Sequence, residues 1–129
     1  MDNVACKWLS YAERDVKRAK VMLRENDPGA STFFSQQAAE KALKAILVSH
    51  GINPPRTHSI EYLLDMVRGL GVNVSGLEEA EILTDYAVES RYPDFGEEPS
   101  EEEAERALTI AEMVVSFAKD YLARRGLKC

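Results

Sequence analysis

Apolar residues recur at helical spacing along almost the whole chain, and this periodicity limits the fold more than any other feature. No stretch alternates apolar and polar residues as a half-buried strand does. A helix with one apolar face must bury that face against another element. The pattern predicts a set of packed helices at residues 3–25, 29–50, 59–70, 75–90 and 100–125.

The helix boundaries are marked by residues that cap or interrupt helices. Asp27 followed by Pro28 is typical of a helix start, and Gly51 is typical of a helix end. Two further starts match the capping box, Ser75 with Glu78 and Ser100 with Glu103. We therefore expect an all-α fold with a single domain at residues 1–129. Its architecture would be an antiparallel up-and-down bundle of about five helices, with a four-helix-bundle-like core.

The two cysteines, Cys6 and Cys129, lie near the two ends of the chain and lack the spacing of a zinc or redox motif. Strict alternation over five helices makes the first and last helices parallel. That arrangement places the two thiols at opposite ends of the bundle, beyond the roughly 7 Å between α-carbons that a disulfide allows. We expect two free cysteines that are far apart.

The charge balance argues against a general nucleic-acid binder. The chain has 16 Lys plus Arg against 22 Asp plus Glu, a net charge of −6, with a dense acidic block at residues 97–105. Affinity for phosphates comes mostly from cations, so we expect no strong non-specific nucleic-acid binding. The longest uncharged runs, residues 28–39 and 45–55, are each little more than half the length of a membrane span. With no secretory signal at its start, the chain is expected to be cytoplasmic and to have no membrane association.

Several enzyme signatures are missing from the sequence. There is no glycine-rich dinucleotide or phosphate-binding motif and no His-Glu-x-x-His metal motif. Neither His50 nor His58 follows a glutamate at the spacing of a di-iron bundle. We expect no metal site, no cofactor and no catalytic activity of the chain's own.

Polar residues on the first two helices form the first candidate site. Asp15 falls on the inward side of its helix, and a hairpin around Asp27 sets it level with the glutamate and lysines of the second helix. One interpretation is structural, with Asp15 paired to a lysine and Glu40 paired to Lys44. The other is a binding face for an anionic ligand. The residues of that face are Gln37, Lys41 and Lys44.

Two loops supply the remaining candidates. His58 precedes the third helix, where free backbone N–H groups favour an anion, although His58 or Ser59 could simply cap that helix. Arg91 and Tyr92 offer a guanidinium for phosphate and a ring that can stack on a base; alternatively, Arg91 binds helix-terminal carbonyls. Strict alternation brings His58, Arg91 and Tyr92 to one end of the bundle, close to Lys41 and Lys44.

These residues resemble a known family in their order and spacing. The segment 34–47, which contains Gln37, Glu40, Lys41 and Lys44, is followed by Thr57-His58-Ser59-Ile60 and then by Ser90-Arg91-Tyr92-Pro93. This ordered set is similar to the HEPN domain, a name that stands for higher eukaryotes and prokaryotes nucleotide-binding. The resemblance covers nearly the whole chain. It implies a helical bundle similar to the carboxy-terminal domain of aminoglycoside nucleotidyltransferases, frequent dimerisation, and pairing with a separately encoded minimal nucleotidyltransferase.

One departure from that family bears on activity. Many HEPN ribonucleases and toxins carry an arginine followed by a histidine with four to six residues between them, and no such pair occurs here. Ribonuclease activity is therefore disfavoured. Two hypotheses stay open: a nucleotide- or substrate-binding module that completes a nucleotidyltransferase, and a ligand-free dimeric interaction or toxin–antitoxin component. The cluster of large apolar side chains predicts a homodimer. Its residues are Trp8, Tyr11, Phe33 and Phe34.

Overall fold

The computed structural model describes residues 2–91, 93–94 and 97–129, with the side chains of all these residues except 2 and 87–91. The α-helices span Asp2–Arg24 (α1), Pro28–Ser49 (α2), Ile60–Gly69 (α3), Ile82–Arg91 (α4) and Glu101–Arg124 (α5). A short 3₁₀ helix, η1, spans Glu78–Glu81 and leads into α4. The described residues contain no strand. The prediction of an all-α bundle is confirmed.

Side-chain caps begin the helices at most of the expected positions. The Asp27 carboxylate accepts a hydrogen bond from the Ala30 N–H, with Pro28 in the first turn of α2. Ser100 and Glu103 form the reciprocal capping box of α5. Such caps satisfy backbone N–H groups that have no partner within the helix. These starts are therefore set by local sequence.

The capping box expected at Ser75 and Glu78 is wrong. The Glu78 carboxylate instead accepts from the Gly76 N–H at 2.9 Å, and Leu77 directly precedes η1 without a side-chain cap. Gly76 has a φ of 91°, a left-handed conformation that glycine adopts without a steric penalty. This local turn shifts the start of the helix to Glu78 and makes its first turn a 3₁₀ helix.

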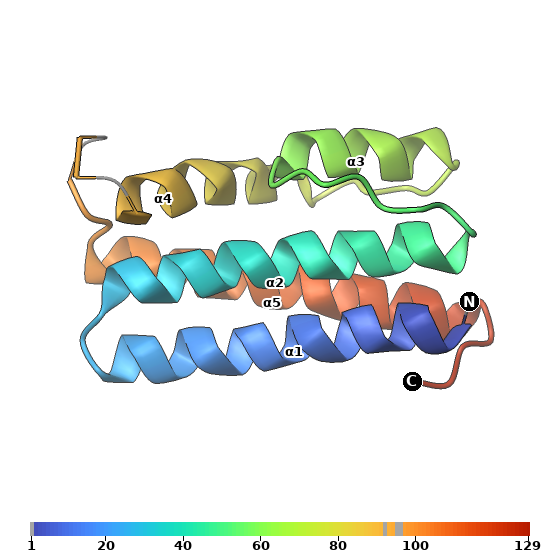
Figure 1. The fold of residues 1–129 in the computed structure, drawn as a ribbon, viewed down its shortest axis with the longest axis horizontal. Coiled ribbons are helices and arrows are strands. Elements are labelled where there is room, and N and C mark those ends of the chain that lie inside the picture. Colours follow the sequence, from blue (N-terminus) through green and yellow to red (C-terminus); the bar gives the residue numbers. More distant parts are fainter. Residues whose placement is uncertain (1, 92, 95–96) are drawn as a thin grey trace.

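Helix α2 lies at the centre of the bundle and contacts α1, α3, α4 and α5. Figure 1 shows that α3 and α4 lie end to end in one row above α2, and that they run in opposite directions from a shared starting region. At that region the Ile60 N–H of α3 donates to Thr84 Oγ1 of α4 at 3.2 Å. The linkers that follow α2 and α3 each run back along the bundle before the next helix begins.

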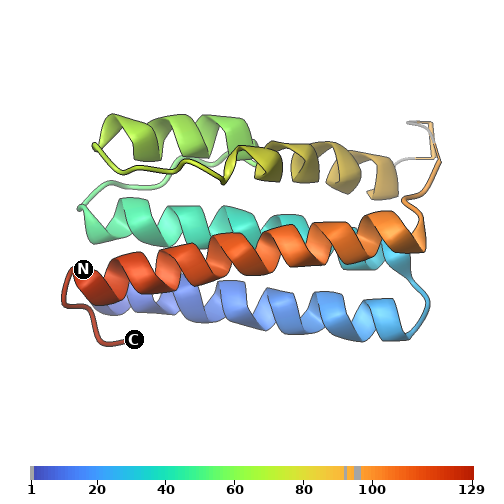
Figure 2. The same ribbon diagram turned by 180° about the vertical axis from the view of Figure 1, so that it is seen from behind.

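Because α3 and α4 share one row, the directions of the helices differ from the predicted alternation. Helices α1, α2, α4 and α5 alternate, and α3 is an additional helix that runs parallel to α2. Helices α1 and α5 are therefore antiparallel, and the chain's ends lie together (Figure 2). Cys6 and Cys129 form a disulfide, with their α-carbons 5.1 Å apart. The prediction of two distant free thiols is wrong because it counted α3 and α4 as two separate rows.

The core follows α2 and is rich in small side chains. Alanines on α2 and α5 are fully buried, which lets these helix backbones approach closely. Larger side chains from α2, α3 and α4 fill the space around them. Burial on nearly every side of α2 explains why its apolar pattern is less one-sided than that of α1. The polar side chains that α2 does bury are therefore unusual and define the candidate site.

Candidate functional site

The first group of buried charges joins α1 to α2. The Asp15 side chain is 1% exposed and contacts Lys41 Nζ through Oδ2. Its Oδ1 accepts from Arg18 Nη1 at 3.1 Å, one helical turn further along α1. A buried carboxylate is costly unless cations or hydrogen bonds compensate it. The expected ion pair between Asp15 and a lysine is present, and Lys41 is the lysine involved.

A second group surrounds Glu40, on the side of α2 that faces the linker before α3. Its Oε2 accepts from Lys44 Nζ at 3.0 Å, and its Oε1 accepts from Gln36 Nε2 at 3.2 Å. The same Oε1 lies 2.8 Å from His58 Nδ1. Gln36 also donates to the His58 carbonyl at 2.9 Å, so the linker is held by both its backbone and its ring.

Of the two ring nitrogens of His58, only Nδ1 contacts Glu40. Nδ1 faces Glu40, while the side chain as a whole is 73% exposed. A carboxylate at one ring nitrogen fixes the orientation of an imidazole and supports a proton at that nitrogen. The contact with Glu40 therefore holds the exposed His58 ring in place, where it can contact a ligand at the surface.

The proposed cationic face of α2 is used largely within the protein. Lys44 is buried, contacts Glu40, and has its ammonium 5.8 Å from the centre of the Trp8 ring. Lys41 contacts Asp15, and Gln37 donates to Gln36 Oε1 at 3.2 Å. Cations neutralised in this way have little charge left for a ligand.

The structure places His58 beside Lys44. It does not bring the start of α3 and the end of α4 together at one end of the bundle, as was predicted. α2 and α4 end at opposite ends of the bundle, and His58 lies near the middle of α2. The predicted convergence at one end is wrong because the linker before α3 runs back along α2. Arg91 is the last residue of α4, but its side chain and the whole of Tyr92 lie outside the described residues.

Sequence reasoning missed a second polar cluster where α2 ends. His50 Nε2 lies 2.6 Å from the Tyr121 hydroxyl and 3.0 Å from Arg125 Nη1, and Arg125 Nη2 donates to the Ser49 carbonyl at 3.2 Å. Partial burial and then the Arg125 guanidinium both lower the pKa of His50, because each disfavours a second positive charge. No local motif signals this cluster, since His50 and Arg125 are far apart in sequence. Gln36 was missed too, although it stands one turn before Glu40.

Two features were not found among the residues that the structure describes. No helix among them combines the length and apolar character needed to cross a membrane. No group of three or more His, Cys, Asp and Glu side chains is arranged there to hold a metal ion.

The fold and the buried polar side chains of α2 define a class of protein. It is a small helical bundle whose central helix carries charged side chains that are neutralised within the protein. Comparison with known proteins identifies the class, since the model of the HEPN domain matches residues 5–121. This chain belongs to the HEPN family.

Three relatives place the chain within that family. It is 34% identical to a Methanocaldococcus jannaschii protein named "Putative toxin MJ1304", over 94% of this chain and 90% of that protein. The crystal structure of TT1696 from Thermus thermophilus has a TM-score of 0.83 and 31% identity, covering 93% of this chain and 98% of the other. ST0689, described as an archaeal HEPN homologue, has a TM-score of 0.72 and 27% identity, with 92% and 97% coverage.

Proposed function

We propose that this chain is the HEPN component of a toxin–antitoxin pair and that it acts through its dimer and partner surfaces. The observation that carries the proposal is the similarity to a protein named as a toxin along nearly the full length of both chains. The neutralised charges on α2 also support an interaction role. Lys41 and Lys44 each contact a carboxylate, as expected of cations that stabilise the bundle.

An apolar surface on α1 supports association with a second copy. Val4, Lys7, Trp8 and Tyr11 line a shallow pocket of about 150 Å³. Val4 is 48% exposed and Tyr11 is 39% exposed. Contiguous apolar surface of this kind is typical of an interface. Phe33 and Phe34, the other two residues of the predicted cluster, are half-buried on α2. The homodimer stays a prediction that light scattering at micromolar concentration can test.

The proposed antitoxin partner is a separately encoded minimal nucleotidyltransferase. The test is inducible expression of the chain alone, and together with such a protein encoded beside it. We expect the chain alone to slow growth, and co-expression to restore growth with the two proteins purifying together. The variant His58→Gln, with Glu61→Gln as a neighbouring exposed control, tests whether the His58–Glu40 pair contributes to the growth effect.

The same experiment has outcomes that contradict the proposal. Normal growth with no co-purification of the two proteins would contradict the proposed toxin–antitoxin role. Normal growth together with faster nucleotidyl transfer by the co-purified partner would favour the other function, a binding module that completes the nucleotidyltransferase. His58 is the predicted ligand contact that the structure leaves most accessible in that case, because its side chain is 73% exposed.

A further inference from the structure

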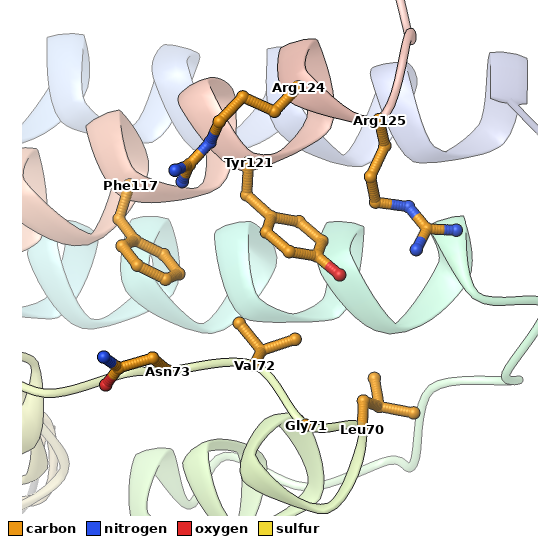
Figure 3. Close-up of a pocket in the computed structure, with 8 residues that line it drawn as sticks. All are labelled: Leu70, Gly71, Val72, Asn73, Phe117, Tyr121, Arg124 and Arg125. Atoms are coloured by element: carbon orange, nitrogen blue, oxygen red, sulfur yellow. The ribbon is translucent and has the colours of Figure 1, made fainter.

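A cavity of about 500 Å³ opens between the C-terminal part of α5 and the loop at residues 70–73 that follows α3. Phe117 and Tyr121 point from α5 toward the loop, and Leu70 and Val72 point from the loop toward α5 (Figure 3). All four side chains are half-buried, so each keeps some apolar surface in contact with solvent. The volume lies within the range of pockets that bury drug-sized groups, so one large side chain fits together with its adjoining backbone.

Both walls of the cavity are fixed within the fold. The Gly71 N–H donates to the Arg68 carbonyl at 2.9 Å, and the φ of 83° at Gly71 is a conformation that glycine adopts without strain. Val74, which ends the loop, is buried in the core. On α5 the rings of Phe117 and Tyr121 lie parallel, with their centres 6.5 Å apart. A surface that is already ordered loses little conformational freedom when a partner binds to it.

Two arginines border this apolar cavity on different sides. Figure 3 shows the guanidinium groups of Arg124 and Arg125 on opposite sides of Tyr121. Arg125 contacts His50 and donates to the Ser49 carbonyl, and neither arginine has a carboxylate partner among the described residues. No Asp or Glu lines the cavity in this part of the structure, although the chain as a whole has a net charge of −6. Two cations separated by a ring match two carboxylates that flank an apolar group.

We propose that this cavity binds an acidic segment of a partner protein, in which carboxylates flank one large apolar side chain. The apolar side chain lies between Phe117 and Val72, and the flanking carboxylates pair with Arg124 and Arg125. An apolar anchor in a pocket with arginine beside it is a frequent arrangement in protein interfaces. Helix α1 and its apolar surface lie on the other side of α2 from this loop, so the proposal does not depend on the toxin–antitoxin role or on the homodimer.

The test is fluorescence anisotropy of a labelled peptide titrated with the full chain. The peptide has a central leucine, two aspartates on each side and uncharged ends. The net charge of −6 repels such a peptide from the protein as a whole, so binding reports a local site. We expect it to bind about tenfold or more tightly than two matched peptides, one with serine replacing the leucine and one with asparagines replacing the aspartates.

Three results of this titration would overturn the proposal. Equal binding of the serine peptide would mean that the apolar walls play no part. Equal binding of the asparagine peptide would mean that the arginines play no part. Absence of saturable binding of the leucine peptide would remove the site itself.

A reversed charge locates the peptide on the chain. Arg124→Glu changes an exposed side chain that has no described carboxylate partner, so we expect an unchanged fold by circular dichroism and about a tenfold or greater loss of peptide affinity. Lys17→Glu on α1 is the matched control. Lys17 is also exposed and has no ion pair among the described residues, and its reversal changes the net charge equally. This control should leave the affinity nearly unchanged.

The same two variants also separate the proposal from its alternatives. Equal losses of affinity in Arg124→Glu and Lys17→Glu would place the peptide elsewhere on the protein and contradict the proposal. A change of oligomeric state in Arg124→Glu alone, measured by light scattering, would assign the cavity to a second copy of this chain and would contradict it as well.

Discussion

Charged side chains make different contacts in the middle of the bundle and at the end near the C-terminus of α5. In the middle, both oxygens of Glu40 are shared among Lys44, His58 and Gln36, and all of these contacts are internal. At the end, Arg125 contacts only uncharged or weakly basic groups among the described residues. The middle is held together by ionic contacts, whereas the end is held by the Cys6–Cys129 disulfide. Buried charge in the middle of the bundle is therefore neutralised by ionic contacts, whereas Arg125 at the end has no carboxylate partner among the described residues.

The largest expected effect is loss of the covalent restraint at the end. The disulfide spans 123 residues of sequence, and closing so long a loop restricts the unfolded chain strongly. We expect the double variant Cys6→Ser/Cys129→Ser to lose about 4–5 kcal/mol of unfolding free energy. Urea unfolding measures this loss. A reducing agent should lower the stability of the natural protein to that of the variant and leave the variant unchanged; equal stability of the oxidised protein and the variant would contradict the prediction.

Neutralising Glu40 should have the next largest effect. Glu40→Gln keeps the shape of the side chain but leaves the buried ammonium of Lys44 without its carboxylate. Breaking one partner from a buried ion pair costs about 3 kcal/mol. The matched control is Asp65→Asn, which removes the exposed ion pair to Arg68 and should cost no more than about 0.5 kcal/mol. Similar losses from the two variants would show that the Glu40 pair is no more important than a surface contact.

The arginine at the end should matter less to stability than Glu40 does. Arg125→Gln removes exposed hydrogen bonds to Ser49 and His50. We expect a loss of about 1 kcal/mol or less, because exposed polar contacts exchange readily with water. Thermal unfolding compared directly with Glu40→Gln measures the difference. A larger loss in Arg125→Gln would reverse the comparison between the two regions.

The smallest effect concerns the pH dependence of stability. The pKa of His50 in the folded state is lowered, so the unfolded state takes up its proton first as the pH falls. The contribution of His50 to stability is therefore present above the ordinary histidine pKa of about 6.5, and it is lost as the pH falls through the lower folded-state value. His50→Gln should reduce the fall in melting temperature between about pH 7.5 and pH 5. An identical fall in both proteins would indicate that other groups account for it.

The helices were predictable because their signals are local. Asp27, Ser59 and the Ser100–Glu103 pair each accept hydrogen bonds from N–H groups within three residues, and these caps determine where helices begin. The failure at Ser75 has a local cause too, since the turn at Gly76 gives the Glu78 carboxylate a nearer partner. Signals that act within a few residues can be recognised in sequence even when two of them compete.

The positions of the helices relative to one another were less predictable. Whether α3 and α4 share a row depends on the paths of the two linkers, and no pattern in those linkers specifies that they run back along the bundle. The same path brings His58 to Glu40 and separates α4's end from α2's end. The pairing of Asp15 with Lys41 was anticipated because it needs only the hairpin of α1 and α2. Contacts that depend on the path of a linker, such as the contact of His58 with Glu40, were not anticipated.

The disulfide also gives the protein a closed covalent outline. In the oxidised protein, the segment from Cys6 to Cys129 forms a covalent ring. A single cut in the turn between α1 and α2, near the exposed Asn26, would leave every helix attached to the same molecule. After reduction, the same cut would leave α1 held by its packing, its ion pairs and the hydrogen bond from Ser31 to the Ala19 carbonyl. Whether the disulfide is oxidised therefore decides whether a nick in this turn leaves α1 covalently attached to the other helices.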